Sequence, residues 1–211
     1  MKVTAKRFTA LLLLAVHVVA MSGCSLNKSE SYDISGYVRG VMKCGYLGDN
    51  ADYVASGVSE TTAADYHTTT VYNAAVRFFT KYNIDASDEQ IAAMEEVLTT
   101  AYANSKFTVN DETEASYGYD VVVTYSVQTT FVDIEAEINT KVEALSIAGE
   151  SEEDRNEVIN SIIELCRNTS EQATSYGEVE TVTFDIQKDT SGNLSLNTKL
   201  FTKIDSAILP F

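Results

Sequence analysis

Few side chains in this sequence are placed for catalysis. A nucleophilic site of the Ser-His-Asp or Cys-His type needs a histidine as general base, and His67 is the single histidine after residue 23. It sits beside three threonines on a predicted helix, where a solvated or half-buried histidine is the usual case. Zinc sites need several His or Cys ligands at short spacing, and the sequence has no phosphate-binding glycine loop. We therefore expect no catalytic residue, no metal and no cofactor.

Carboxylates are abundant, and a pair of them is the machinery of glycoside hydrolysis. Sequence singles out no such pair, because the candidates have structural explanations as solvent-facing or helix-starting acids. These acids are Glu89, Glu95, Glu96, Glu150, Glu152, Glu153 and Asp154. The segment Gly48–Asp52 offers oxygen ligands for calcium but lacks the twelve-residue loop with a closing glutamate. An envelope hydrolase with paired carboxylates stays an alternative.

Cysteines and tyrosines each leave two interpretations open. Cys44 and Cys166 fall on predicted helices, so they form either a disulfide between those helices, in an exported protein, or two buried free thiols. Tyr117, Tyr119 and Tyr125 lie along one predicted strand. They provide either a binding surface or core packing with hydroxyls that reach the edge.

The first 23 residues have the pattern of an export signal. A basic start precedes an apolar run at 8–19, which is shorter than the ~20 residues of a transmembrane helix. Met21-Ser22-Gly23-Cys24 resembles the lipobox of bacterial lipoproteins, with Met21 where leucine is usual. The resemblance implies cleavage before Cys24 and transfer of a diacylglyceryl group to its sulfur. An ordinary secretory signal cut near Ala20–Gly23 is the alternative.

This signal divides the chain into three parts. Residues 1–23 form the signal peptide, residues 24–33 the lipidated cysteine with a polar, flexible tether, and residues 34–211 a single globular domain. Two or more acyl chains anchor a protein stably to a membrane. We therefore expect an exported protein that is held by lipid on the outer face of the cell membrane.

The charge of the chain excludes some partners. Three of the 15 basic residues and none of the 31 acidic residues lie in the signal, which leaves a mature net charge of −19. Such a surface repels nucleic acid, whose binding depends on neutralising phosphates. It also disfavours direct adhesion to anionic lipid, so membrane attachment falls to the lipid on Cys24.

Helical periodicity marks five segments. They are 34–47 between Asp33 and Gly48, 59–82, a helix after the Ser87/Gln90 capping box, 132–147 and 152–173. In the first, Gly36, Gly40 and Cys44 lie four residues apart and leave one side bare. This spacing predicts the close approach of another helix, with a ligand groove as the alternative.

Alternating residues mark the strands. Phe107 and Val109 precede a longer alternation from Tyr119 to Val127, and the two read as a hairpin. A second hairpin joins 182–186 to 194–200. The order predicts an α+β fold with a four-stranded antiparallel sheet of two hairpins packed against about five helices. Its general architecture is similar to cystatin-like and nuclear-transport-factor-like folds.

A weak internal echo accompanies this pattern. Ser116-Tyr117-Gly118 and Ser175-Tyr176-Gly177 recur at an offset of 59, and Val123 and Val182 share that offset. Duplication of a helix–strand unit and chance similarity between two amphipathic strands are both compatible with it.

Several short motifs together resemble a family. They are Asp33-Ile34-Ser35-Gly36-Tyr37-Val38, Tyr46-Leu47-Gly48-Asp49, Lys106-Phe107-Thr108-Val109 and Tyr176-Gly177. With the lipobox, they resemble small uncharacterised lipoproteins of Gram-positive bacteria over most of the mature chain. The resemblance implies a location and no functional residue.

The expected function follows from the anchor and from the missing catalytic set. We expect a membrane-tethered binding or scaffold domain rather than an enzyme. Its ligand would be a protein, a peptide or an envelope polymer. The alternatives are the hydrolase and a structural subunit of an envelope complex.

Overall fold

The computed structural model describes residues 33–147, 151–172, 174–190, 192 and 194–211. The predicted signal peptide, Cys24, the tether up to residue 32 and Glu150 lie outside these residues. Among the helices that are described, none is both long and apolar enough to cross a bilayer.

The chain begins with α1 (Ile34–Met42), a π-helical turn η1 (Lys43–Leu47) and a short α2 (Ala51–Ala55). Asp33 starts α1, because its carboxylate accepts a hydrogen bond from the Gly36 amide at 2.6 Å. Gly48 ends η1 in the left-handed region, at φ 66°. A Cβ on Gly40 would lie 2.8 Å from the Tyr53 amide nitrogen. The predicted close approach is therefore confirmed at Gly40, where α2 fills the bare side.

Four longer helices follow the predicted segments closely. Ser59 caps α3, and Ser87 with Gln90 forms both hydrogen bonds of the predicted capping box at the start of α4. The third of these helices starts at Glu135, after the predicted Val132, because residues 130–134 form a turn first. The bounds are α3 (Glu60–Lys81), α4 (Asp88–Ala103), α5 (Glu135–Ile147) and α6 (Glu152–Gln172).

One antiparallel sheet forms in the order β1-β3-β4-β5, and β2 also pairs with β3. The strands are β1 (Phe107–Val109), β2 (Thr113–Ala115), β3 (Gly118–Gln128), β4 (Tyr176–Lys188) and β5 (Leu194–Leu196). Phe107 lies opposite Tyr125, and Val123 opposite Val182. The two segments of the 59-residue echo thus become β3 and β4, which meet at their shared valine. The predicted α+β architecture of hairpins backed by helices is confirmed, and β2 and α2 are additions to it.

The end of the chain differs from the prediction. Leu200 was expected in the last strand, but it lies in α7 (Lys199–Ile208), after a β5 of only three residues. Leu200 is spaced four residues from both Leu196 and Ile204, and this spacing fits a helix as well as a strand. Burial decides for the helix, because Phe201, Ile204 and Ile208 are all buried on one side of it.

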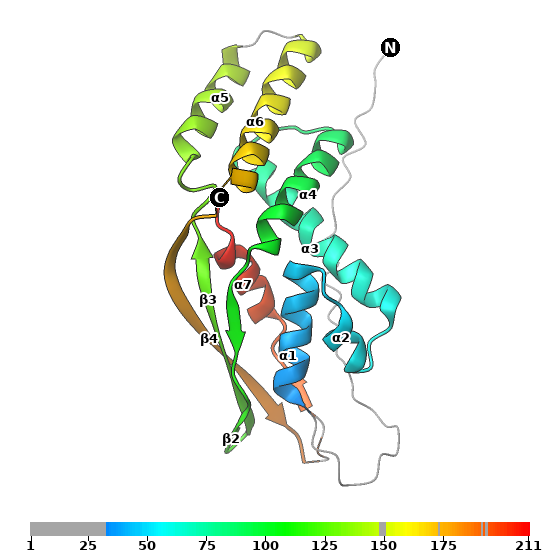
Figure 1. Cartoon of the computed structure of the whole chain (residues 1–211). Helices are drawn as coiled ribbons and strands as arrows, with labels where there is room; N and C mark the ends of the chain where they lie inside the picture. Colours follow the sequence, from blue (N-terminus) through cyan, green and yellow to red (C-terminus); the bar gives the residue numbers. More distant parts are fainter. Residues whose placement is uncertain (1–32, 148–150, 173, 191, 193) are drawn as a thin grey trace.

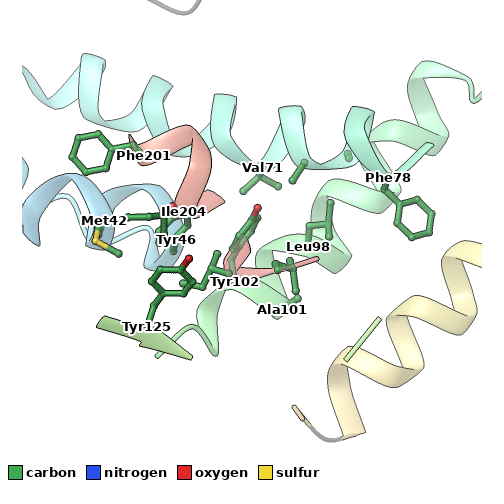
Figure 2. Packing of buried hydrophobic residues seen from close by; sticks show 14 of the residues in the cluster. Met42, Tyr46, Val71, Phe78, Leu98, Ala101, Tyr102, Tyr125, Phe201 and Ile204 are labelled. Atoms are coloured by element: carbon green, nitrogen blue, oxygen red, sulfur yellow. The ribbon is translucent and has the colours of Figure 1, made fainter. Parts of the chain in front are cut away.

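The core lies between the sheet and the helices. Phe201 of α7 contacts Phe184 of β4 with ring centroids 4.7 Å apart, and Tyr46 stacks on Tyr102 at 5.4 Å. Figure 2 shows the side chains of α7 and α4 converging above Tyr125 of the sheet. In Figure 1 the helices stand on one side of the curved strands β3 and β4. The other side of the sheet is therefore the place to look for a binding surface.

Candidate functional site

The outer sheet face is the strand surface that points away from the core. Its side chains alternate with the buried residues of β3 and β4, and none of them is buried. Three threonines lie in one row across the sheet, because Thr108 is opposite Thr124 and Thr124 opposite Thr181. The face consists of Thr108, Thr113, Asp120, Val122, Thr124, Ser126, Val179, Thr181, Thr183 and Asp185.

An acidic pair interrupts this hydroxyl-rich surface. Asp120 on β3 lies directly opposite Asp185 on β4, an arrangement that destabilises a sheet because like charges repel. The hydroxyl of Tyr117 donates a hydrogen bond to Asp120, and its oxygen lies 3.4 Å from Asp185 Oδ1. The Asp120 hydrogen bond raises the pKa of Tyr117 to about 12. At neutral pH Tyr117 is therefore a donor, and it does not neutralise either carboxylate.

On the inner side, the first half of β4 has exposed side chains. Glu178 and Glu180 occupy inner-face positions yet are exposed. Tyr125 is buried and donates to Glu180 Oε2 at 2.6 Å. Lys106 lies 3.7 Å above the ring of Tyr176. This end of the strand is acidic on its inner face, whereas its outer face carries the exposed side chain of Val179.

A second tyrosine–aspartate pair lies on the helical side of the molecule. The hydroxyl of Tyr102 donates to Asp205 Oδ1 at 2.7 Å, and Arg77 Nη1 bonds Asp205 Oδ2 at 2.8 Å. Burial raises the pKa of the Tyr102 hydroxyl well above its usual range. The guanidinium also lies 5.2 Å from the ring centroid of Phe211. This network ties α7 to α3 and α4 and buries its donors and acceptors against one another.

His67 lies on α3, half-buried, as the sequence predicted. Its Nδ1 makes a 2.9 Å hydrogen bond with the Gly45 carbonyl oxygen. A Cβ on Gly48 would lie 3.4 Å from its Nε2. The imidazole thus packs against the middle and the C-terminal end of the π-helical turn, and this contact gives it a structural role.

The acidic loop considered for calcium already has a cation. Lys43 Nζ lies 2.8 Å from Asp52 Oδ2 and 4.0 Å from Asp49 Oδ2. The Asp52 hydrogen bond raises the pKa of Lys43. In the described part of the chain, no three His, Cys, Asp or Glu side chains gather as metal ligands.

The other candidate acids lie apart from the outer sheet face. Glu89 and Glu96 are exposed on α4, and Glu95 is half-buried there. Glu152 and Glu153 line a shallow, open depression on the first turns of α6, and Asp154 is exposed beside them. Glycoside hydrolysis needs two carboxyl groups that flank one bond, whereas these acids are exposed or half-buried on the surfaces of α4 and α6.

Cys44 and Cys166 are free thiols, and both are fully buried. Cys44 Sγ lies 3.1 Å from the Ala63 carbonyl oxygen, which accepts its weak hydrogen bond. Burial raises the pKa of Cys44 to about 11 and that of Cys166 to about 12. Of the two interpretations, the structure has the pair of buried thiols rather than the disulfide.

The three tyrosines of the long strand do not form one exposed surface, because Tyr119 is half-buried against the core. Tyr117 precedes β3 and is 42% exposed, whereas Tyr125 is buried in the core with its hydroxyl at the edge.

Asp185 was missed by sequence reasoning, although the alternation of β4 places it on the polar face. Only the register between β3 and β4 brings it opposite Asp120, and the alternation of the two strands restricts that register only to steps of two residues.

No protein-family model matches this chain, and no curated protein matches it. Its fold is similar to the crystal structure of YcdA from Bacillus subtilis subsp. subtilis strain 168, which is provisionally named a lipoprotein. The TM-score is 0.56 at 12% sequence identity, over 85% of this chain and 57% of that chain. The chain thus spans less than two thirds of that protein. At this identity the likeness concerns the fold alone.

Proposed function

We propose that this chain is an extracytoplasmic lipoprotein, anchored through lipid on Cys24, whose folded domain binds a partner through the outer sheet face. The observation that carries the binding role is the Asp120/Asp185 pair. Two like charges directly across a sheet cost stability, and proteins accept such local conflicts mainly at functional sites. The pair lies on an exposed face with rows of hydroxyls, where a ligand can satisfy all of these groups at once.

Two observations support the anchored location. One is the sequence Met21-Ser22-Gly23-Cys24 behind a short apolar run. The other is the fold likeness to a protein provisionally named a lipoprotein. The finer assignment, to small uncharacterised lipoproteins of Gram-positive bacteria, rests on the sequence resemblance alone.

Lipidation is tested by metabolic labelling with an alkyne-tagged palmitate in a bacterial host. We expect label and membrane fractionation for the wild-type chain and for a Cys44→Ala variant, since Cys44 is buried. Cys24→Ala should lose both. Label that persists in Cys24→Ala would contradict the anchor.

Binding is tested by a thermal-shift screen of the mature chain with Cys24→Ser, against cell-wall fragments, sugars and peptides. A ligand at 100 times its Kd stabilises the native state by ~2.7 kcal/mol. We expect the Asp120→Asn/Asp185→Asn variant to lose the shift and Glu153→Gln, a remote exposed acid, to keep it. A hit that survives the double substitution would place binding elsewhere.

A further inference from the structure

Strand β4 has a free edge over most of its length. It pairs with β3 from Tyr176 to Gln187, but β5 covers its other side only from Ile186 to Lys188. In the described part of the chain no other strand pairs with it. Figure 1 shows β4 along the outer margin of the sheet. Such an edge presents unpaired backbone groups to solvent.

The register identifies which groups are free. On β3, the Ser126 amide bonds Lys106, and the Val122 carbonyl accepts from Asn110, so even-numbered residues of β3 direct their backbone toward β1. Odd-numbered residues of β3 therefore face β4. Their partners on β4 are even-numbered, and alternation leaves the odd-numbered residues of β4 facing outward. The amides and carbonyls of Val179, Thr181 and Thr183 are thus free to pair.

The side chains of this edge indicate what can pair with it. Val179 is 65% exposed, the highest value among the exposed large hydrophobic residues, and the threonines beside it are small. On the opposite side of the strand, Glu178 and Glu180 are exposed. Inward-pointing charges of this kind deter pairing between two copies of the same edge, and the net charge of the mature chain, −19, adds to that repulsion.

The geometry points to one occupant: an extended, basic segment of a partner protein that adds to the β4 edge as a further strand. Its backbone pairs with Val179, Thr181 and Thr183, as in other cases of strand addition. Its alternate lysine or arginine side chains lie beside Glu178 and Glu180. This inference rests on the proposed function, because it names the class of partner for the surface that β4 borders.

The probe is a ten-residue peptide of alternating lysine and threonine, titrated against the mature chain with Cys24→Ser by fluorescence anisotropy. Its matched control carries N-methyl groups on every second backbone amide, which keeps the charge and removes the donors on one edge. We expect the methylated peptide to bind at least tenfold more weakly. Equal affinity of the two peptides would mean that they bind by general charge attraction, and it would overturn the inference.

In the protein, the most specific test of the β4 edge is the Thr181→Pro variant. Proline removes the outward amide at a position where the ladder to β3 does not use it, and edge strands tolerate such a proline. We expect at least tenfold weaker peptide binding, with Thr181→Ala, which keeps the amide, binding like wild type. Glu178→Gln/Glu180→Gln should weaken binding and flatten its salt dependence. If Thr181→Pro does not fold, the methylated peptide still decides.

Two further outcomes overturn the inference. One is that the unmodified peptide does not bind at millimolar concentration. Ligand binding at the outer sheet face, as measured by thermal shift, would still hold in that case. The other is self-association of the wild-type chain, in analytical ultracentrifugation, that Thr181→Pro abolishes. A second copy would then be the occupant.

Discussion

Two tyrosine–aspartate pairs lie on opposite sides of this molecule, and they differ in their third member. In one pair, Tyr102 and Asp205 share an arginine, Arg77, and the Asp205 side chain is 15% exposed. In the other, Tyr117 and Asp120 share a second carboxylate, Asp185, on an exposed face. The tyrosine–aspartate hydrogen bond is therefore part of a charge-balanced contact in the first pair. In the second pair it is part of a contact with two negative charges and no positive one.

The difference separates what holds the fold from what is available to a partner. Arg77, Tyr102 and Asp205 come from three helices, and a partly buried ion pair of this kind is costly to break because one charge is left without a counter-charge. Asp120 and Asp185 repel each other in water, where screening keeps the repulsion small. Substitutions in the first pair should therefore change stability, and those in the second should change binding.

The largest expected effect is that of Asp205→Asn. The variant leaves the Arg77 guanidinium partly buried without its carboxylate, which should lower the free energy of unfolding by about 3 kcal/mol. Urea unfolding followed by circular dichroism measures it. The double variant Arg77→Leu/Asp205→Asn should lose less than the sum of the two single losses, because no charge is then stranded. No loss of stability in Asp205→Asn, or a gain like the one expected for Asp185→Asn, would contradict the distinction between the pairs.

Tyr102→Phe removes only the hydroxyl from the same network. A hydrogen bond to a charged group contributes about 1.5–3 kcal/mol, and Arg77 keeps Asp205 paired, so we expect a loss near the lower value. Tyr117→Phe is the matched control, since it deletes a hydroxyl with the same partner type at an exposed site. It should change the urea midpoint much less. Equal losses would mean that burial does not distinguish the two hydrogen bonds.

Sequence predicted the local elements of this molecule better than the contacts that join them. Helix caps at Ser59 and Ser87 and the alternation around Val123 are local signals, and the structure confirms them. The Arg77–Asp205 contact joins residues far apart in the chain. Asp205 lies on α7, a helix that the sequence analysis assigned in part to a strand because of the leucine spacing near residue 200. Phe201, Ile204 and Ile208 also lie at helical spacing, and their burial decided the ambiguity in favour of the helix.

Alkaline pH tests the effect of burial on another side chain, the thiol of Cys166, which is buried on α6. Burial raises its pKa from 9.0 to about 12, so between these values the unfolded chain ionises the thiol while the folded chain does not. Its contribution to stability is full below pH 9 and declines as pH rises toward 12. At pH 10, relative to pH 8, wild type should lose about 1 kcal/mol more than Cys166→Ala. Parallel pH profiles for the two proteins in urea unfolding would contradict this.

Asp185→Asn should have the smallest effect on stability and the opposite sign. It removes one of two like charges that face each other across β3 and β4, so relief of repulsion should raise Tm by about 1–2 °C at low salt. Added salt screens exposed charges, so the gain should vanish near 1 M sodium chloride, whereas the loss in Asp205→Asn should persist. A differential scanning calorimetry series over salt concentration measures both variants together. If Asp185→Asn instead lowers Tm, the Asp120/Asp185 pair stabilises the sheet, and the argument that it is kept for binding a partner loses its basis.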